Sequence, residues 1–364
     1  MDKTSLRIQV QDRAPTPDIV ERVREVLERG ALAALPTETV YGLAARADRP
    51  DALRRLMEAK ERPPIEALTW HAGDAAALEA FPRISPMAER LAAKYWPGPL
   101  TLVLPGVPAG LELVARDDWT GVRVPAQIAT QKLLAALEFP VVMSSANKHG
   151  EAPALTADEV ERQFGGRVNL IVDGGPSRMG ESSSVLRLGR GKFELLRPGL
   201  FTIEQLRAVA GLKIAFVCTG NTCRSPMAEG LARKFLAERL GAKEREIAAF
   251  GFSVMSMGVF ASNGAPASKH SVDVLAQEGI DISHHRSKTA TLEEVSRMDR
   301  VYGLTRGHVE ELRKLLPPGK AKSVALLDPD GGDVSDPIGG TVADYERTAA
   351  QIRSAIEARL DEWA

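Results

Sequence analysis

The sequence predicts an α/β protein of two domains, a mixed α/β domain over residues 1–210 and a doubly wound parallel-sheet domain over residues 211–364. Length is the first reason, because 364 residues exceed the roughly 100–200 residues of one ordinary domain. Alternation is the second, since helix-like and strand-like patterns follow one another in both halves. The third is a break near residue 210, where a short helical pattern ends at Gly211 and a new apolar strand begins.

The first half opens with an amphipathic helix. Thr16 and Pro17 provide an N-cap and a proline at the first helical position, and the apolar stripe that follows stops at Gly30. A hairpin closes this half, its strands joined through Gly189 and Gly191. The patterns predict strands at 31–35, 100–104, 122–124, 140–143, 170–172, 183–188 and 192–196, and helices at 51–60, 86–95, 126–137 and 157–164.

The second half begins with an apolar strand at 214–217 and ends with a helix from Thr341 to about Leu360 that carries one apolar face. Strands and helices alternate between these two elements. Parallel strands that are joined by right-handed helical crossovers form a sheet with helices on both faces. We therefore expect a doubly wound sheet in this half.

Composition excludes several classes of protein. Lys and Arg number 47 against 48 Asp and Glu, so the net charge of −1 gives no bulk electrostatic reason to bind nucleic acid or an anionic membrane. Two cysteines cannot form a disulfide framework. The N-terminus lacks the apolar segment of a secretory signal, and no run approaches the roughly 18 apolar residues of a membrane span. We expect a cytoplasmic protein without a membrane partner.

A loop of small residues after the first strand of the second half has the composition of an anion site. Cys218 ends the strand, and Arg224, Ser225 and Pro226 open the following helix, with Pro226 expected at its first position. Backbone N–H groups of such a loop bind an oxyanion and favour a thiolate at Cys218. Arg224 can bind two phosphate oxygens, and Ser225 can donate to the thiolate. The alternative is a buried strand cysteine without a catalytic role.

The pattern Cys218-x5-Arg224-Ser225 resembles the signature of the low-molecular-weight protein tyrosine phosphatase family, and the resemblance spans residues 212–364. It implies hydrolysis of a phosphorylated protein through a phosphocysteine, with Cys218 as the nucleophile and with no metal or other cofactor. The loop residues implied to bind phosphate are Thr219, Gly220, Asn221, Thr222, Cys223 and Ser225.

Two Asp-Pro pairs, at Asp328 and Asp336, compete for the role of general acid. The family places its acid in the loop before the last helix, which favours Asp336. A solvated turn is the alternative, since Asp-Pro-x-Gly is common in turns. A calcium loop starting at Asp328 is excluded, because Asp333 and Gly339 stand where an EF-hand needs glycine and glutamate. The histidines of this half show no metal-ligand spacing and are expected at capping or surface positions.

Two features favour phosphoarginine over phosphotyrosine as the substrate. Tyrosine-directed members carry aromatic residues after Asp-Pro, whereas Ile338 and Gly339 follow it in this chain. Thr222 resembles the loop threonine of bacterial protein-arginine phosphatases, in which it favours the guanidinium. A thioredoxin-coupled arsenate reductase is excluded because Cys223 is the only cysteine besides Cys218, but a reversible disulfide between these two stays open.

Four polar segments of the first half stand at the ends of predicted elements, where α/β folds assemble their sites, at residues 36–43, 60–63, 123–125 and 144–147. Each alone is most often a loop, a cap or a solvated helix end. Together with the Trp-Pro-Gly-Pro-Leu-Thr run at 96–101, they resemble the P-T-E-T-x-Y-G-L, K-x-R, R-x-P and S-A-N marks of the YrdC-like family of threonylcarbamoyl-AMP synthases, over about residues 15–200.

This resemblance implies that ATP, L-threonine and bicarbonate are converted to threonylcarbamoyl-AMP and pyrophosphate. ATP is a substrate that can carry Mg²⁺, and the tRNA-modifying threonylcarbamoyl transferase machinery is the implied partner. Adenylate formation needs no protein nucleophile, so we expect positioning and charge neutralisation to drive it. The residues implied for ATP are Lys60, Arg62, Ser145, Asn147, Ser183 and Arg197, and those implied for threonine are Thr37, Tyr41, His71 and Arg123.

Three departures from the family pattern bear on rate and on threonine fit: Trp70 beside His71, Lys148-His149 after the Ser-Ala-Asn run, and Ser184 where threonine is customary. The expected protein is a bifunctional enzyme, a nucleotidyltransferase and a hydrolase. The competing interpretation makes the first half a non-catalytic nucleotide- or RNA-binding module and leaves only a protein tyrosine phosphatase. The near-neutral charge argues against strong RNA binding.

Overall fold

The computed structural model describes residues 5–10, 14–61, 68–148, 150–317 and 323–364. The chain divides into two compact units, Met1–Leu206 and Arg207–Ala364. A mixed sheet forms the first unit and an all-parallel sheet the second, so the α/β class predicted from the sequence is confirmed in both units.

In the first unit, the described residues form one mixed sheet of ten strands. The strands Leu6–Gln9, Gly42–Arg46 and Thr69–His71 were not predicted from the sequence. The first lies at the sheet edge, the last has only three residues, and Gly42–Arg46 is buried along most of its length and shows no apolar alternation. In spatial order the strands are β1 (Leu6–Gln9), β8 (Leu170–Asp173), β2 (Ala33–Leu35), β3 (Gly42–Arg46), β7 (Val141–Ser145), β4 (Thr69–His71), β6 (Trp119–Arg123), β5 (Leu100–Pro105), β9 (Ser184–Gly189) and β10 (Lys192–Arg197).

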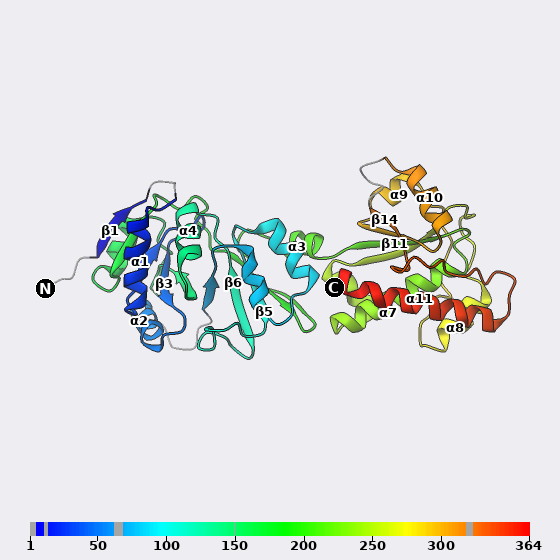
Figure 1. Cartoon of the computed structure of the whole chain (residues 1–364), viewed down its shortest axis with the longest axis horizontal. Coiled ribbons are helices and arrows are strands. Elements are labelled where there is room, and N and C mark those ends of the chain that lie inside the picture. Colours follow the sequence, from blue (N-terminus) through cyan, green and yellow to red (C-terminus); the bar gives the residue numbers. More distant parts are fainter. Residues whose placement is uncertain (1–4, 11–13, 62–67, 149, 318–322) are drawn as a thin grey trace. The chain divides into compact units, whose positions relative to one another are not determined.

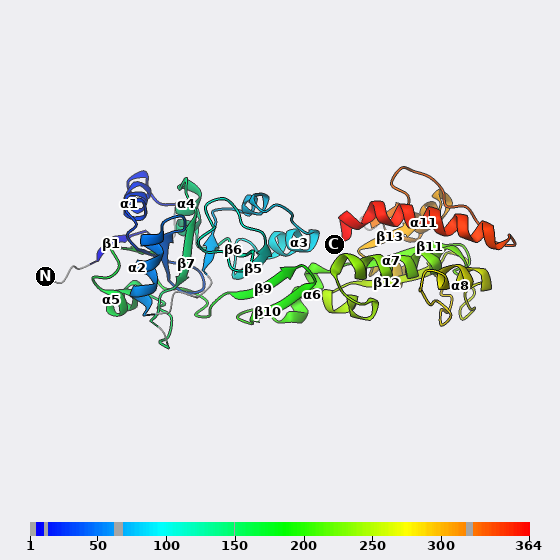
Figure 2. The same ribbon diagram turned by 90° about the horizontal axis from the view of Figure 1, so that it is seen from below.

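Helices cover both faces of this sheet. Alternate residues of β2 enter different clusters: Leu35 joins α1 and α4 on one face, whereas Ala34 joins α2 and α5 on the other. Figure 2 shows α1 and α4 on one side and α5 on the opposite side. The helical elements are α1 (Pro17–Glu28), α2 (Pro50–Lys60), the 3₁₀ helix η1 (Ala75–Ala80), α3 (Pro86–Tyr95), α4 (Ile128–Ala136), α5 (Ala157–Phe164) and α6 (Ile203–Ala210), which crosses the division between the units.

The second unit has a parallel sheet with the strand order β12-β11-β13-β14. Its first strand in sequence, β11, lies inside the sheet between β12 and β13. Helices α7, α8 and α11 pack together on one face, and α9 and α10 lie on the other (Figure 1). The predicted doubly wound arrangement is therefore confirmed. The strands are β11 (Lys213–Cys218), β12 (Ser253–Gly258), β13 (Arg300–Gly303) and β14 (Val324–Leu326), and the helices are α7 (Arg224–Leu240), η2 (Glu244–Phe250), α8 (Lys269–Ala276), α9 (Leu292–Ser296), α10 (Arg306–Leu315) and α11 (Val342–Trp363).

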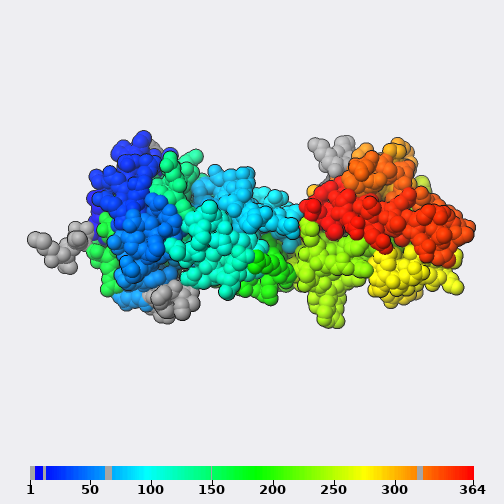
Figure 3. All heavy atoms as spheres, turned by 60° about the horizontal axis from the view of Figure 1, so that its bottom comes forward, coloured from blue at the N-terminus to red at the C-terminus, as the bar shows by residue number. Residues whose placement is uncertain are grey.

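Two helix starts in this unit differ in how they match the sequence. Helix α11 begins after Thr341, which forms a capping box with Asp344, and its outer side is exposed along the surface (Figure 3). Helix α7 begins at Arg224, so the expectation that Pro226 occupies the first helical position is wrong. Pro226 is tolerated two residues later because the N–H groups of a first helical turn have no partner within the helix.

No helix among the described parts of the chain combines the length and the apolar character needed to cross a lipid bilayer.

Two candidate active sites

A cavity of about 290 Å³ lies over the middle of the mixed sheet, and strands β3, β4, β5, β6 and β7 all contribute to its wall. The structure brings together at this cavity most of the residues predicted for the first half. Those that line it are Thr37, Tyr41, His71, Arg123, Ser145, Ser183 and Arg197. Residue Arg62, predicted to neutralise phosphates, lies outside the described residues.

Lys60 and Asn147 do not line the cavity, but both contact Ser145, which does. The Lys60 side chain is only 1% exposed, and its Nζ donates to the Ser145 carbonyl. The Ser145 hydroxyl donates to Asn147 Oδ1 over 2.5 Å, and the Asn147 amide donates to the carbonyls of Lys148 and Glu151. These contacts hold the segment that follows β7 in place. Asn147 is therefore linked to the cavity through its hydrogen bond with Ser145.

The loop before β3 is held by its own side chains. The Thr37 hydroxyl donates to the Val40 carbonyl over 2.5 Å and accepts from the Val40 N–H over 3.2 Å. The Tyr41 hydroxyl donates to the Gly175 carbonyl over 2.8 Å. Burial, followed by the charge of Asp173, raises the pKa of Tyr41 well above its ordinary value. Tyr41 therefore lines the cavity while its hydroxyl is bound to the Gly175 carbonyl.

Arg123 is the buried cation of the cavity, and its guanidinium is fixed by three neighbours. Nε donates to the Gly98 carbonyl over 3.1 Å, and Nη2 donates to Glu38 Oε1 over 2.6 Å and to Thr39 Oγ1 over 2.9 Å. A side chain at Gly98 would place its Cβ 2.3 Å from the Tyr95 carbonyl oxygen, which explains the glycine in the Trp-Pro-Gly-Pro run. Glu38 and Thr39 belong to the sequence motif at residues 36–43, but the sequence predicted no role for them.

His71 stands on β4 within the same cavity as a neutral imidazole. Its Nδ1–H donates to the Thr69 carbonyl over 3.0 Å, so Nε2 keeps a lone pair that can accept a hydrogen bond. Burial, and then the charge of Arg123, lower the pKa of His71 to about 3. The neighbouring Trp70 packs into the core near Phe81 and does not line the cavity.

Ser183 and Arg197 close the cavity from the β9–β10 hairpin. Arg197 donates from Nε to the Ser183 carbonyl over 2.9 Å and from Nη2 to the Ser183 hydroxyl over 3.0 Å. Thr101 Oγ1 lies 2.9 Å from the same hydroxyl. Ser184, one of the departures from the family pattern, accepts from the Phe201 N–H and donates to the Pro198 carbonyl, so its hydroxyl holds the segment that follows β10 and does not line the cavity.

The second candidate site is the loop between β11 and α7. Cys218 Sγ lies 2.9 Å from the Ser225 hydroxyl and accepts from the Asn221 N–H over 3.3 Å. Asn221 adopts a left-handed φ of 55°, which asparagine tolerates better than most residues. Its side-chain amide donates to Ser225 and to Ser256, both over 2.9 Å. The Asn221 N–H donates to the sulfur, and the Ser225 hydroxyl lies within hydrogen-bond distance of both the sulfur and the Met257 carbonyl, so a thiolate at Cys218 can take the Ser225 proton as a second donor.

Arg224 and Asp336 meet at the mouth of this loop. Arg224 Nη2 donates to Asp336 Oδ2 over 2.6 Å, and Nη1 donates to the Val334 carbonyl over 3.3 Å. The Arg224 side chain is buried, whereas that of Asp336 is 43% exposed. The predicted general acid therefore lies beside the guanidinium that is predicted to bind phosphate. The competing Asp328 accepts from the N–H groups of Asp330 and Gly332 within its own turn.

Thr222 and Cys223 complete the loop and are held by helices α8 and α11. The Thr222 carbonyl accepts from the Ser268 N–H over 2.8 Å. Cys223 Sγ lies 3.4 Å from the Tyr345 hydroxyl, and both cysteines are buried and unbridged. The disulfide between Cys218 and Cys223 stays a prediction.

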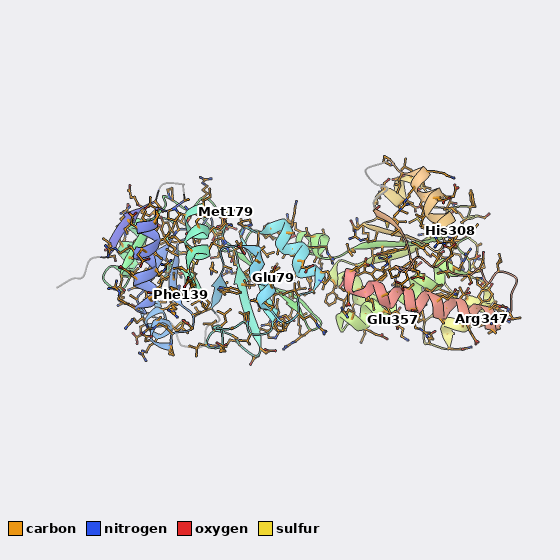
Figure 4. All side chains as sticks on the ribbon, viewed as in Figure 1. Glu79, Phe139, Met179, His308, Arg347 and Glu357 are labelled. Atoms are coloured by element: carbon orange, nitrogen blue, oxygen red, sulfur yellow. The ribbon has the colours of Figure 1, made fainter. Side chains whose placement is uncertain are left out.

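Three residues of this site were missed in the sequence. His308, at the first turn of α10 (Figure 4), lies with Nε2 2.9 Å from Thr219 Oγ1 and with Nδ1 3.0 Å from the hydroxyl of the capping Thr305. It is 6% exposed, so of the two predicted positions, capping or surface, it does not take the surface one. Burial, and then the charge of Arg224, lower the pKa of His308 to about 4. His285 Nε2 donates to the Asn221 carbonyl over 2.8 Å. A Cβ on Gly258 would lie 2.5 Å from the Thr219 carbonyl oxygen.

Neither site shows a metal centre: among the described residues, no three His, Cys, Asp or Glu side chains gather as metal ligands.

Comparison with known proteins matches each unit to a different family. Residues 25–199 match the Sua5, YciO and YrdC family model, which is described as telomere recombination, and residues 213–363 match the low molecular weight phosphotyrosine protein phosphatase model. A threonylcarbamoyl-AMP synthase of Pyrococcus abyssi is 37% identical over 220 residues, which are 58% of this chain and 63% of that protein. The chain therefore spans less than two thirds of this curated relative.

Two solved structures extend the comparison. A variant of P. abyssi Sua5 with two alanine substitutions is 33% identical, with a TM-score of 0.51, and the match covers 64% of this chain and 76% of that one. A low molecular weight protein tyrosine phosphatase from T. tengcongensis is 35% identical, with a TM-score of 0.38, and the match covers 42% of this chain and 99% of that one. The chain belongs to the Sua5/YciO/YrdC family through residues 25–199 and to the low molecular weight phosphotyrosine protein phosphatase family through residues 213–363.

Proposed function

We propose that the first unit converts ATP, L-threonine and bicarbonate into threonylcarbamoyl-AMP and pyrophosphate. One observation carries the proposal: residues predicted for ATP and residues predicted for threonine line a single cavity, although they come from positions 37 to 197 of the chain. The threonine ammonium loses one proton to water, the resulting amine attacks bicarbonate, and water leaves, which gives a carbamate. A carbamate oxygen then attacks the α-phosphorus of ATP, and the bond to the β-phosphate breaks to release pyrophosphate.

Each side chain has a positioning or charge-neutralising role in this scheme, because no protein nucleophile is needed. Arg123 faces the threonine carboxylate, and the lone pair on His71 Nε2 accepts from the threonine ammonium. Thr37 and the Tyr41 ring form the wall of the amino-acid site. Lys60, Arg62 and Arg197 neutralise the phosphates, and Ser145, Asn147 and Ser183 orient the nucleotide. Mg²⁺ enters bound to the phosphates of ATP.

The product is an activated threonylcarbamoyl donor, so the transferase machinery that modifies adenosine in tRNA is the partner that consumes it. Supply of ATP and two reduced cysteines suit a cytoplasmic location.

The test is pyrophosphate release from ATP by the full chain, with L-threonine and bicarbonate each added or omitted. Release that requires both supports the proposal. Release that is unchanged without threonine overturns it. ATP or RNA binding without any turnover would instead favour a non-catalytic module.

We propose that the second unit is a cysteine-dependent protein phosphatase, so that the chain is bifunctional. Cys218 Sγ attacks phosphorus, and the bond to the leaving group breaks as Asp336 gives that group a proton. Arg224 donates to two phosphate oxygens. Water, deprotonated by Asp336, then attacks the phosphocysteine and releases phosphate and the Cys218 thiolate. The convergence of Asn221 and Ser225 on the Cys218 sulfur supports this nucleophile most directly.

Phosphoarginine is our proposed substrate for this unit. Ile338 follows the Asp-Pro pair and is 72% exposed, so this loop offers no aromatic ring to stack on a phenol. The second observation that favours phosphoarginine is Thr222, which resembles the loop threonine of protein-arginine phosphatases. Matched peptides that carry phosphoarginine or phosphotyrosine, tested with the wild type and with Cys218→Ser, decide the question. Faster hydrolysis of the tyrosine peptide overturns the preference, and hydrolysis by Cys218→Ser overturns the nucleophile.

A further inference from the structure

The cavity of the first unit must separate two anions, because an amino-acid carboxylate and a polyphosphate bind in the same site under the proposed function. Both are attracted by arginine and lysine, so charge alone does not tell them apart. Arg123 is the buried arginine of that wall, with 4% of its surface exposed. What its guanidinium is bound to therefore decides which anion it selects.

We propose that Glu38 is a positioning and specificity-determining residue, which pairs with Arg123 so that this arginine accepts a carboxylate and rejects a polyphosphate. Glu38 is 8% exposed and is itself fixed at both oxygens. Oε1 accepts from Arg123 Nη2 over 2.6 Å, and Oε2 accepts from the Ala126 N–H over 2.9 Å. This inference rests on the proposed synthase function.

The pairing leaves one guanidinium nitrogen for a ligand. Nε is used by the Gly98 carbonyl and Nη2 by Glu38 and Thr39, whereas Nη1 makes no hydrogen bond among the described residues. A carboxylate can bind through one such N–H donor. A bidentate fork clamp on phosphate uses donors on two different guanidinium nitrogens, and in Arg123 the remaining donors all lie on Nη1.

The net charge around Arg123 also favours an amino acid over a polyphosphate. The Glu38–Arg123 pair is neutral in sum, and the adjacent His71 is a neutral imidazole whose Nδ1–H is bound to the Thr69 carbonyl. A polyphosphate with several negative charges would approach the buried Glu38 carboxylate without a net compensating charge at this part of the wall. The zwitterionic amino acid, which has no net charge, is therefore accepted beside Arg123, and a polyphosphate is excluded from this part of the wall.

Glu38→Gln tests the role of the charge, because glutamine has nearly the same size and its oxygen can still accept from Arg123. Calorimetric titration of the full chain with sodium triphosphate and with L-threonine is the measurement. In the wild type we expect triphosphate and L-threonine to bind at the same time, without competing with each other. In Glu38→Gln we expect the triphosphate affinity to rise by about tenfold or more and triphosphate to compete with L-threonine, since Arg123 then carries an uncompensated charge.

Two further variants keep the result interpretable. Glu38→Asp retains the charge but shortens the side chain, so we expect weaker L-threonine binding without triphosphate competition. Glu25→Gln, at an exposed carboxylate on α1, is the matched control and is expected to behave as wild type. Thermal melts establish that each variant is folded.

Unchanged triphosphate affinity in Glu38→Gln, or equal competition in Glu38→Asp and Glu38→Gln, overturns the inference. These binding measurements are independent of turnover. A wild type without threonine-dependent pyrophosphate release refutes the synthase function, whereas the triphosphate titrations still report what Glu38 does.

Discussion

Arg224 and Asp336, 112 positions apart in the chain, are joined by a hydrogen bond of 2.6 Å from Nη2 to Oδ2. The guanidinium is buried and the carboxylate is half exposed. A phosphate that enters the loop must therefore share Arg224 with Asp336 or displace it. The proposed phosphate-binding group and the proposed acid are coupled before any substrate arrives.

Asp336→Asn separates these two roles. We expect kcat for phosphoarginine hydrolysis to fall by about 10²–10⁴-fold, because the leaving group receives no proton. We also expect inorganic phosphate to inhibit more tightly, because the carboxylate no longer competes for Arg224. Initial rates with and without phosphate measure both effects. The matched control is Asp328→Asn at the other Asp-Pro pair, and an equal loss of kcat there would contradict the choice of acid.

Ser225→Ala removes a hydroxyl from the Cys218 sulfur. A hydrogen bond to a charged group is worth enough that we expect phosphatase kcat to fall by about 10- to 100-fold. Alkylation of Cys218 by iodoacetamide, followed over time at a fixed pH, should become slower because the sulfur loses the Ser225 contact. Ser253→Ala, at the exposed start of β12, serves as the control. An alkylation profile identical to wild type would sink this role for Ser225.

Gly258→Ala tests how closely β12 supports the catalytic loop. The new Cβ would lie 2.5 Å from the Thr219 carbonyl oxygen and 2.9 Å from the Asn221 nitrogen, so the loop must move. We expect phosphatase activity to fall by about tenfold or more, since small displacements of positioned groups are costly. In Gly307→Ala the Cβ would lie 3.8 Å from its nearest neighbour, and this helical control should keep full activity.

The buried His308 predicts how stability depends on pH. Its pKa of about 4 in the folded chain lies below the ordinary value of 6.5, so between these pH values the unfolded chain binds a proton that the folded chain does not. The free energy of unfolding therefore rises with pH through this window and falls as the pH drops from 6.5 towards 4. We expect His308→Asn to lose part of this pH dependence in denaturant titrations. The control His284→Asn, at an exposed histidine, should retain it.

Trp70→Val places a smaller residue beside His71. Trp70 packs against the core and Phe81, with ring centroids 6.4 Å apart, and does not line the cavity. We expect a loss of roughly 1–3 kcal/mol in the free energy of unfolding. The threonine-dependent rate should stay within about twofold of wild type, since no cavity-lining side chain is changed. A large change in the KM for threonine would show that Trp70 shapes the amino-acid site.

The catalytic loop of the second unit was accessible to sequence reasoning because its members are neighbours in the chain. Cys218 ends β11, Asn221 lies in the following loop and Ser225 lies in the first turn of α7, so local spacing sets their geometry. His308 was not accessible in this way. Its role depends on α10 starting beside β11, which brings it to Thr219 from 89 positions away.

The same distinction holds in the first unit. The motif that contains Glu38 was visible, but its partner Arg123 lies 85 positions further along the chain and its use of each nitrogen depends on Gly98 and Thr39. Short strands such as β4 were missed because three residues give no periodic signal. Pro226 shows that the preference of proline for the first turn of a helix locates the start of α7 to within a few residues, but does not identify its first residue.

The cavity of the first unit draws its wall from residues between Thr37 and Arg197, so it exists only when nearly the whole of that unit is folded. Ligands that bind only the folded state raise its stability as their concentration exceeds their Kd. ATP and threonine should therefore protect this unit from proteolysis along its entire length and not only near the cavity. Under the proposed function, a cell depleted of both would hold less of the intact unit, so the lifetime of the protein would follow the supply of its proposed substrates.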